Sequence, residues 1–229
     1  MVHPEILYED NHVIAVNKAP GVLVQGDRTG DRSILDQLKD YLKERDGKPG
    51  NVFLGLPHRL DRPTSGALIL AKTSKALSRL AASFRDRDVS KIYWAVVENP
   101  PENPEGELCD WLKKDGRTNT SRRVKPGTPG AKEARLRYRL LGASERYWLI
   151  EVELLTGRHH QIRVQLSAMG CVIRGDLKYG ARRSNRNGGI HLHARYLETA
   201  HPVRKERLKI IAPPPDDPVW NALNAVVDS

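Results

Sequence analysis

The chain has 229 residues, of which 39% are hydrophobic and 29% charged, so it can fold around a real core as one large domain or two small ones. Its formal net charge of +10 favours an acidic partner, and nucleic acid is the commonest such partner. The two cysteines, Cys109 and Cys171, stand far apart, which argues against a disulfide framework and a cysteine zinc site, and no apolar run approaches the roughly 20 residues that span a bilayer.

Runs of β-branched and aromatic residues in the first half of the chain predict strands at 6–8, 13–16, 67–71 and 91–97. Apolar residues at helical spacing predict two helices between these strands. The first helix begins after the cap Ser33 and ends between Gly47 and Gly50, and its buried face is Ile34, Leu35, Leu38 and Leu42. The second begins at the cap Ser74, and its buried face is Leu77, Leu80, Ala81 and Phe84.

The second half begins with a proline-rich connector at 99–106 and a basic stretch at 113–132, which we expect to be a long mobile loop. A pair of strands at 134–141 and 147–155 follows. A helix is then expected from about Arg158 to Met169, with Gly170 as its left-handed cap. Two late strands at 191–197 and 208–211 and a short helix at 216–226 complete the predicted elements.

This succession predicts an α+β fold with a mixed, mainly antiparallel central sheet flanked by helices. Strands on both sides of the proline-rich connector are expected to join one sheet system, so we interpret the connector as a junction between lobes. We therefore expect a single domain over residues 1–229.

Basic residues gather in two parts of the chain. Ten of them lie between Trp111 and Arg139, against only Asp115 and Glu133, and a second cluster lies between 174 and 186. Basic runs are often solvated faces that aid solubility. Two clusters with so few acids nevertheless favour a phosphate-binding surface.

The segment His-Arg-Leu-Asp-Arg-Pro-Thr-Ser-Gly at 58–66 is the most informative in the chain. Asp61 stands between Arg59 and Arg62, and Pro63 keeps the segment out of a helix interior. An acid held between fixed positive charges stays ionised, which suits a nucleophile or a charge stabiliser better than a general acid. The alternative is a loop of surface ion pairs.

A second polar segment runs from Thr156 to Arg163. Gly157 favours tight backbone geometry at a helix start, where free N–H groups attract anions. A helix that presents Arg163 to Asp61 would form a bidentate, charge-assisted pair. Alternatively, Arg158 and Arg163 only extend the phosphate-binding surface, and for Arg158 we prefer that interpretation.

The histidines do not form a convincing metal site. His159 and His160 are adjacent and point in different directions on a helix, whereas His191 and His193 would share a strand face with His201 as a third ligand. No further acid completes such a set, so hydrogen-bonded structural histidines are the better interpretation. Glycine-rich phosphate loops are absent, which excludes the usual nucleotide, flavin and nicotinamide motifs.

Tyr93 stands in the middle of an apolar strand, where packing in the core is the default for an aromatic residue. At the edge of a cleft its ring could instead stack on a base, as aromatic residues do in RNA-binding proteins.

Taken in order, these segments resemble the motifs of the RluA family of pseudouridine synthases. Residues 58–72 resemble the family's signature, and residues 13–24 its first motif. Residues 91–97 resemble its tyrosine motif, and residues 151–164 resemble its third motif. Residues 175–180 resemble the continuation of the third motif, and residues 192–195 and 201–202 resemble the C-terminal pattern. The resemblance covers nearly the whole chain.

The resemblance implies roles for individual residues. Asp61 matches the catalytic aspartate, Tyr93 the tyrosine that packs against the target base, and Arg163 the arginine that pairs with the aspartate. Arg59 matches the residue that fills the space left by the flipped nucleotide, and Ile162 an apolar residue of the pocket. Further RNA contacts are expected from Arg62, Arg158, Lys113, Arg122 and Arg123.

The implied reaction is isomerisation of specific uridines in ribosomal or transfer RNA to pseudouridine, without a cofactor or a metal. The alternative is a catalytically silent RNA-binding protein of the same fold. We expect a monomer that binds no membrane and stays in the cytoplasm, because the N-terminus lacks the basic start and apolar core of a signal peptide.

Two features depart from the family pattern. Gln165 stands where the family often has histidine. The motifs also begin within about the first dozen residues, so we expect no N-terminal RNA-binding module before the catalytic domain.

Overall fold

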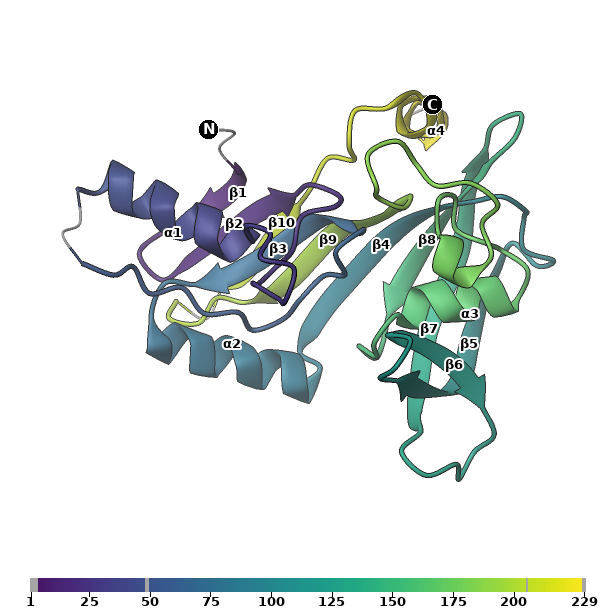
Figure 1. Cartoon of the computed structure of the whole chain (residues 1–229), viewed down its shortest axis with the longest axis horizontal. Helices are drawn as coiled ribbons and strands as arrows, with labels where there is room; N and C mark the ends of the chain where they lie inside the picture. Colours follow the sequence, from purple (N-terminus) through teal and green to yellow (C-terminus); the bar gives the residue numbers. More distant parts are fainter. Residues whose placement is uncertain (1–3, 48–49, 205, 228–229) are drawn as a thin grey trace. The chain divides into compact units, whose positions relative to one another are not determined.

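A computed structural model describes residues 4–47, 50–204 and 206–227. Within these ranges the chain forms a ten-stranded, mostly antiparallel sheet and four α-helices (Figure 1). The strands are β1 (Glu5–Glu9), β2 (Val13–Lys18), β3 (Ser65–Ala71), β4 (Val89–Val97), β5 (Glu105–Asp115), β6 (Thr120–Val124), β7 (Lys132–Ala143), β8 (Trp148–Leu154), β9 (Leu192–Ala200) and β10 (Arg207–Ile211). The helices are α1 (Ile34–Arg45), α2 (Ser74–Asp86), α3 (Gln161–Ala168) and α4 (Pro218–Val227), with a 3-10 turn η1 at Leu177–Tyr179.

The strand order is β1-β2-β3-β9-β4-β8-β7-β5-β6, and β10 pairs with β9. The predicted α+β class with a mainly antiparallel central sheet is therefore confirmed. The chain divides into two compact units, Met1–Ser90 with Ala194–Pro214 and Lys91–His193 with Pro215–Ser229. A single domain over residues 1–229 stays a prediction.

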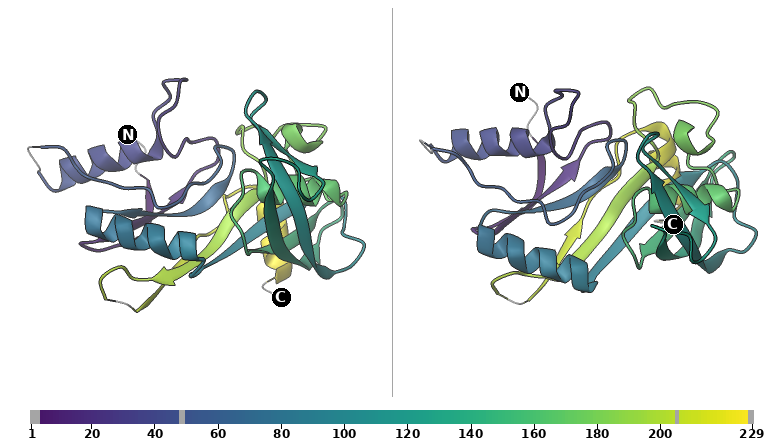
Figure 2. Two further views of the ribbon diagram at one scale, coloured as in Figure 1. Left: turned by 90° about the horizontal axis from the view of Figure 1, so that it is seen from below. Right: turned by 60° about the horizontal axis from the view of Figure 1, so that its bottom comes forward.

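In the first unit, α1 and α2 lie on opposite sides of the strands (Figure 2). Alternate residues of β2 and β3, such as Val13, Ala15 and Ile69, share one core cluster with Ala76 and Leu80 of α2. The helix α2 begins one residue later than its cap Thr73, whose hydroxyl accepts a hydrogen bond from the backbone of Ala76, so the expected cap Ser74 is wrong by one position.

The predicted cap of α1 is confirmed. Ser33 and Asp36 form a capping box in which each side chain accepts a hydrogen bond from the other's backbone N–H. The helix buries Ile34, Leu38 and Leu42 of the predicted face, whereas Leu35 is only half-buried. The expected end of the helix between Gly47 and Gly50 includes residues 48 and 49, which lie outside the described residues. The first three residues of the chain, on which the signal-peptide prediction partly rests, lie outside them as well.

In the second unit, the basic stretch at 113–132 is not a long mobile loop. Its first part completes β5 and its middle forms β6, and the two strands pair as an antiparallel hairpin. The expectation is wrong because polar residues fill both faces of β6, so the sequence lacks the apolar alternation that marks a half-buried strand. Hydrogen bonds between β5 and β6 stabilise this strand, which the composition of the segment does not predict.

The helix α3 begins at Gln161 rather than near Arg158. The Gln161 side-chain oxygen accepts hydrogen bonds from the Thr156 hydroxyl and from the backbone N–H of Arg158, which closes residues 156–160 into a tight loop. Gly157 therefore precedes the helix by a whole loop. Gly170 has φ +88°, which confirms its predicted left-handed cap.

The C-terminal helix α4 matches its prediction closely. Asp217 caps it by accepting hydrogen bonds from the backbone N–H groups of Val219 and Trp220. Trp220 packs in a core cluster with Trp94 and Leu149 of the same unit. No helix among the described residues is long and apolar enough to cross a membrane.

Candidate active site

The loop that carries Asp61 belongs to the first unit and is fixed through its backbone. The Asp61 carbonyl accepts a hydrogen bond from the N–H of Thr64 at 3.0 Å, which closes a tight turn. The Arg62 carbonyl accepts two, from the N–H of Gly21 at 2.9 Å and from Nζ of Lys18 at 3.1 Å. The half-buried Asp61 side chain thus projects from a loop with little freedom to move.

Lys18 is a component of this site that the sequence patterns did not single out. Its side chain is fully buried, and Nζ also donates to the carbonyl oxygens of Ala19 at 2.9 Å and Val22 at 2.8 Å. Burial lowers the pKa of Lys18 to about 7, and the nearby Asp61 carboxylate opposes that shift. Its only signal in the sequence is its place in the 13–24 segment that resembles the family's first motif.

Arg62 braces the loop from outside. Its Nε donates to the Gly21 carbonyl at 2.9 Å, and its Nη2 lies 2.7 Å from the Asp31 carboxylate. The guanidinium therefore ties the loop to residues 21 and 31, and contact with RNA stays a prediction for this residue. Arg59 is exposed.

Two other residues of the 58–66 segment have structural roles. The Nε2 atom of His58 accepts a hydrogen bond from the backbone of Ile69 at 3.1 Å, and its ring stacks on Phe84 with the centroids 4.5 Å apart. Gly66 has φ +113°, and a Cβ atom at this position would lie 2.4 Å from the carbonyl oxygen of Ala194. Only glycine fits this position without strain.

Arg163 lies on α3 in the second unit, where Asp176 is its bidentate partner. Nε of Arg163 is 2.7 Å from Oδ2 of Asp176, and Nη2 is 2.8 Å from Oδ1. The two side chains are only 4% and 1% exposed. Sequence reasoning missed Asp176, although it lies in the 175–180 motif. Asp61 belongs to the other unit, so its pairing with Arg163 stays a prediction.

The aromatic ring of Tyr179 also contacts Arg163, with the guanidinium carbon 5.0 Å from the ring centroid. The Tyr179 hydroxyl lies 2.8 Å from the backbone nitrogen of Ser121 and 2.8 Å from Nδ1 of His160. His159 stacks on His160 and places its own Nδ1 2.9 Å from the Ser121 hydroxyl. These two histidines are therefore engaged in hydrogen bonds within the protein.

The other three histidines considered as metal ligands are engaged as well. His201 bonds Asp10 at 2.8 Å through Nε2 and accepts two backbone N–H groups through Nδ1. Nδ1 of His191 lies 2.9 Å from the side-chain nitrogen of Asn185, and the ring of His193 lies edge-on to Trp220. No group of three or more potential ligands in the described ranges is placed to hold a metal ion.

Two further residues expected at the pocket, Tyr93 and Ile162, belong to the second unit together with Arg163. Tyr93 is 9% exposed in β4, where it pairs with Val152 of β8. Ile162 is 4% exposed in the first turn of α3. Their contacts with a base stay predictions.

The hairpin of β5 and β6 carries a like-charged pair of basic residues. Lys113 and Arg122 are directly opposite one another across the two strands, so two positive side chains share one face. Like charges at such positions repel one another. Arg123, in contrast, forms an ion pair of 2.9 Å with Asp110, and Nε of Arg158 donates to the Glu133 carbonyl at 2.7 Å.

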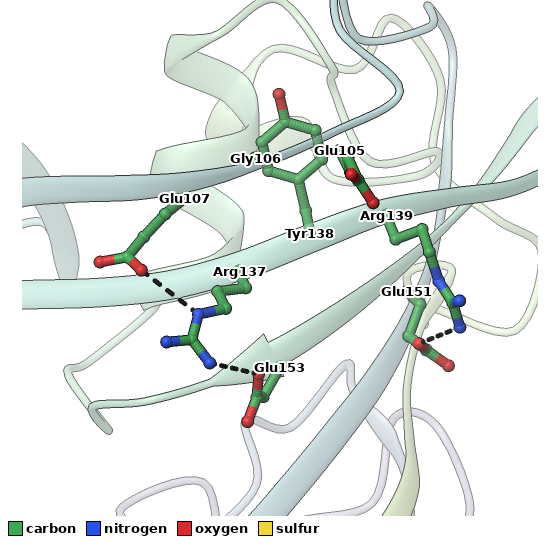
Figure 3. A pocket seen from close by; sticks show the side chains of 8 residues that line it. All are labelled: Glu105, Gly106, Glu107, Arg137, Tyr138, Arg139, Glu151 and Glu153. Carbon is green, nitrogen blue, oxygen red and sulfur yellow. Dashed lines mark hydrogen bonds and ion pairs between the residues drawn. The ribbon is translucent and has the colours of Figure 1, made fainter.

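Three arginines of β7, Arg135, Arg137 and Arg139, form ion pairs with glutamates of β5 and β8. Figure 3 shows the Arg137 guanidinium between Glu107 and Glu153, and Arg139 beside Glu151. These glutamates lie outside residues 111–139, so the count of acidic residues in that segment did not include them. The segment 111–139 is therefore less basic as a surface than as a sequence, and the free positive charge concentrates on the β5–β6 hairpin.

Comparisons with known proteins agree with these motifs. The family model described as RNA pseudouridylate synthase matches residues 12–168. An uncharacterised RNA pseudouridine synthase of Synechocystis is 34% identical over 214 residues, covering 92% of this chain and 65% of that protein. The ribosomal large subunit pseudouridine synthase C of Vibrio parahaemolyticus is 33% identical over 214 residues, again covering 65% of its length.

The chain thus spans about two thirds of the length of these relatives. Among solved structures, the human RNA pseudouridylate synthase domain containing 4 superposes with a TM-score of 0.79 at 25% identity, covering 98% of this chain and 93% of that one. The matched residues include Asp61, Tyr93 and Arg163. The chain belongs to the RNA pseudouridylate synthase family, as its resemblance to RluA-type enzymes predicted.

Proposed function

We propose that this protein isomerises uridine to pseudouridine within RNA, with Asp61 as the catalytic carboxylate. The bond between ribose C1′ and uracil N1 breaks, and a bond between C1′ and C5 forms. The proton on C5 leaves to solvent and N1 gains one, so no oxidant, reductant or water is consumed. The target base must leave the RNA stack before it reacts, which costs a few kcal/mol.

The observation that carries this proposal is the family match over residues 12–168 together with the rigid loop at Asp61. A carboxylate that must meet one ribose carbon benefits from a fixed backbone, because misplacement slows the reaction. We assign Arg163 as the partner that pairs with Asp61 and Tyr93 as the ring that packs against the base. Ile162 would line the pocket, and Arg59 would fill the vacated position in the stack.

We assign the grip on RNA to the β5–β6 hairpin. Lys113 and Arg122 lie opposite one another, and a phosphate between them would relieve their mutual repulsion. The names of the Vibrio relatives favour ribosomal RNA over transfer RNA as the target. The protein would act in the cytoplasm as a monomer, without a metal or an organic cofactor.

The decisive experiment compares the wild-type protein with Asp61→Asn on RNA that carries tritium at C5 of uridine. Asp61→Asn should bind the RNA and release no tritium above background, because the amide cannot supply the carboxylate. Asp86→Asn is the matched control, since this exposed aspartate at the end of α2 belongs to the same unit. Turnover by Asp61→Asn would contradict the assignment.

Two further measurements separate the alternatives. Arg163→Ala should lose most of its rate, and a rate within about twofold of wild type would refute the assigned pairing with Asp61. A catalytically silent RNA-binding protein predicts instead that the wild-type protein itself binds RNA without tritium release. A metal-dependent phosphodiesterase that uses His191, His193 and His201 is a further alternative, and activity that persists in excess EDTA would exclude it.

A further inference from the structure

We infer that Tyr179 is a positioning residue that joins the RNA-gripping β5–β6 hairpin to Arg163. Its ring would hold the guanidinium, and its hydroxyl would hold the hairpin against α3. The inference rests on the proposed function, because that function assigns the RNA contact to the hairpin and the pairing with Asp61 to Arg163. Tyr179 lies in the 175–180 segment of the family resemblance, which assigns this residue no role.

The ring and the carboxylate that contact Arg163 come from one short segment. Asp176 supplies the bidentate ion pair, and Tyr179 follows three residues later in the 3-10 turn η1 with its ring 5.0 Å from the guanidinium. The Asp176 carbonyl accepts hydrogen bonds from the N–H groups of Tyr179 and Ala181, which closes the turn. The segment therefore fixes Arg163 by a charge in one direction and by an aromatic ring in another.

The hydroxyl of Tyr179 makes two hydrogen bonds, and one arrangement lets it donate one and accept the other. The Ser121 backbone N–H is a donor, so the phenol oxygen accepts there, and we assign the phenol proton to Nδ1 of His160. His160 then carries its proton on Nε2. Burial lowers the pKa of His160 to about 2, with Arg163 as a further cause, so the ring remains a neutral acceptor.

His160 has φ +53°, a left-handed conformation that non-glycine residues rarely adopt, and it stands directly before α3. Such strain persists only where surrounding contacts hold it. The Tyr179 hydroxyl is one of those contacts. The same hydroxyl therefore links the start of the helix that carries Arg163 to β6 of the hairpin through two hydrogen bonds.

Two parallel contacts support this link along α3. The Ser121 hydroxyl meets Nδ1 of His159 at 2.9 Å. Within α3, Nε2 of Gln165 donates to Asp110 at 2.9 Å, and Asp110 also pairs with Arg123 of β6. Gln165, which departs from the family pattern, is thus also part of the attachment. Tyr179 contacts the hairpin through Ser121 and also contacts Arg163.

The two functions of Tyr179 can be separated by substitution. Tyr179→Phe keeps the ring over Arg163 and removes the hydroxyl with its hydrogen bonds to Ser121 and His160, whereas Tyr179→Leu removes the ring contact as well. We expect Tyr179→Phe to raise KM for RNA about five- to tenfold with kcat within about twofold, because one hydrogen bond is lost at the hairpin. Tyr179→Leu should in addition lower kcat at least about tenfold, since the guanidinium loses its cation–π contact.

The experiment is steady-state tritium release from C5-labelled RNA, with Tyr138→Phe as the matched control. Tyr138 is a half-buried tyrosine of β7 in the same unit and lies outside this network. Its variant should keep the wild-type KM and kcat. If Tyr179→Phe matches the control, or if Tyr179→Phe loses kcat as severely as Tyr179→Leu, the division of roles is wrong.

A spectroscopic measurement covers the case in which Tyr179→Leu fails to fold. Nitrogen chemical shifts of the histidine rings should show His160 as the neutral Nε2–H tautomer from pH 5 to 8 in the wild type, and a mixture of tautomers in Tyr179→Phe. A His160 that is protonated on Nδ1 in the wild type would overturn the inference. If the wild type shows this tautomer but releases no tritium, the proposed function fails and the link to the hairpin still stands.

Discussion

Arg163 and Asp176 form a bidentate ion pair inside the second unit, with N–O distances of 2.7 and 2.8 Å and side chains 4% and 1% exposed. The two residues are 13 positions apart, Arg163 in the segment that resembles the third motif and Asp176 in its continuation. The pair keeps the arginine in one orientation, and each charge compensates for the burial of the other.

Asp176→Asn should therefore be strongly destabilising. Removing one partner of a buried ion pair leaves an uncompensated charge, which lowers the free energy of unfolding by about 3–5 kcal/mol. The rate of tritium release should fall as well, because Arg163 loses its orientation. Urea unfolding followed by circular dichroism, together with the tritium assay, checks both effects.

The double variant Arg163→Met with Asp176→Leu separates stability from catalysis. Replacing both charges by apolar groups should recover most of the stability that Asp176→Asn loses, because buried ion pairs are often replaceable in this way. Its activity should remain absent. A double variant that is both stable and active would show that Arg163 has no part in the reaction.

Lys18 should make stability depend on pH. Its pKa is about 7 in the folded chain against an ordinary value of 10.5, so between these values the unfolded chain binds more protons. The free energy of unfolding should then rise with pH through this window, by at most about 1.4 kcal/mol per pH unit. Below pH 7 the contribution no longer changes.

The measurement is the difference between wild type and Lys18→Met in urea unfolding at pH 6.5, 8 and 9. Other titrating groups are common to both proteins and cancel in the difference. Lys43→Met, at an exposed position of α1 in the same unit, is the control and should give a flat difference. A flat difference for Lys18→Met would mean that the buried amine keeps its proton throughout.

The like-charged pair Lys113 and Arg122 predicts opposite effects on stability and binding. Arg122→Ala should leave the free energy of unfolding unchanged or raise it by up to about 0.5 kcal/mol, because cross-strand repulsion is relieved. Affinity for RNA should fall, and the slope of log K against log salt should decrease by about 0.7 to 0.9. Fluorescence anisotropy with labelled RNA at several salt concentrations measures both.

Arg137→Ala is the control for this prediction. Arg137 is already paired with Glu107 and Glu153 on the outer face of β7, so its loss should leave the salt slope unaltered. Equal slopes for all three proteins would remove the hairpin from the RNA-binding surface.

Gly66→Ala should prevent stable folding of the first unit. The position has φ +113°, and the new Cβ would lie 2.4 to 2.8 Å from backbone atoms of Ala194, so strain and overlap together should cost at least about 3 kcal/mol. Gly26→Ala, at an exposed position with open space around it, should change stability by no more than about 0.5 kcal/mol. Thermal unfolding of the two variants tests this contrast.

Local patterns predicted most elements but failed where an element lacks an apolar face. The helix α1 and the strand β3 were found because buried residues recur at the helical period or form a continuous run. The strand β6 was missed because its residues are nearly all polar, and only pairing with β5 identifies it. The start of α3 was misplaced because the Gln161 side chain closes the preceding loop.

The candidate site divides in the same way. The sequence by itself determined the family, the loop with Asp61, and the helix with Arg163, because short motifs and apolar periodicity are properties of neighbouring residues. Only the tertiary structure decided that Asp176 pairs with Arg163, that Lys18 holds the Arg62 carbonyl 44 positions away, and that the Tyr179 hydroxyl meets Ser121 58 positions away. Such contacts depend on where folding brings distant polar atoms within about 3 Å of one another, and a hydrogen bond or ion pair of this kind leaves no periodic trace in the sequence.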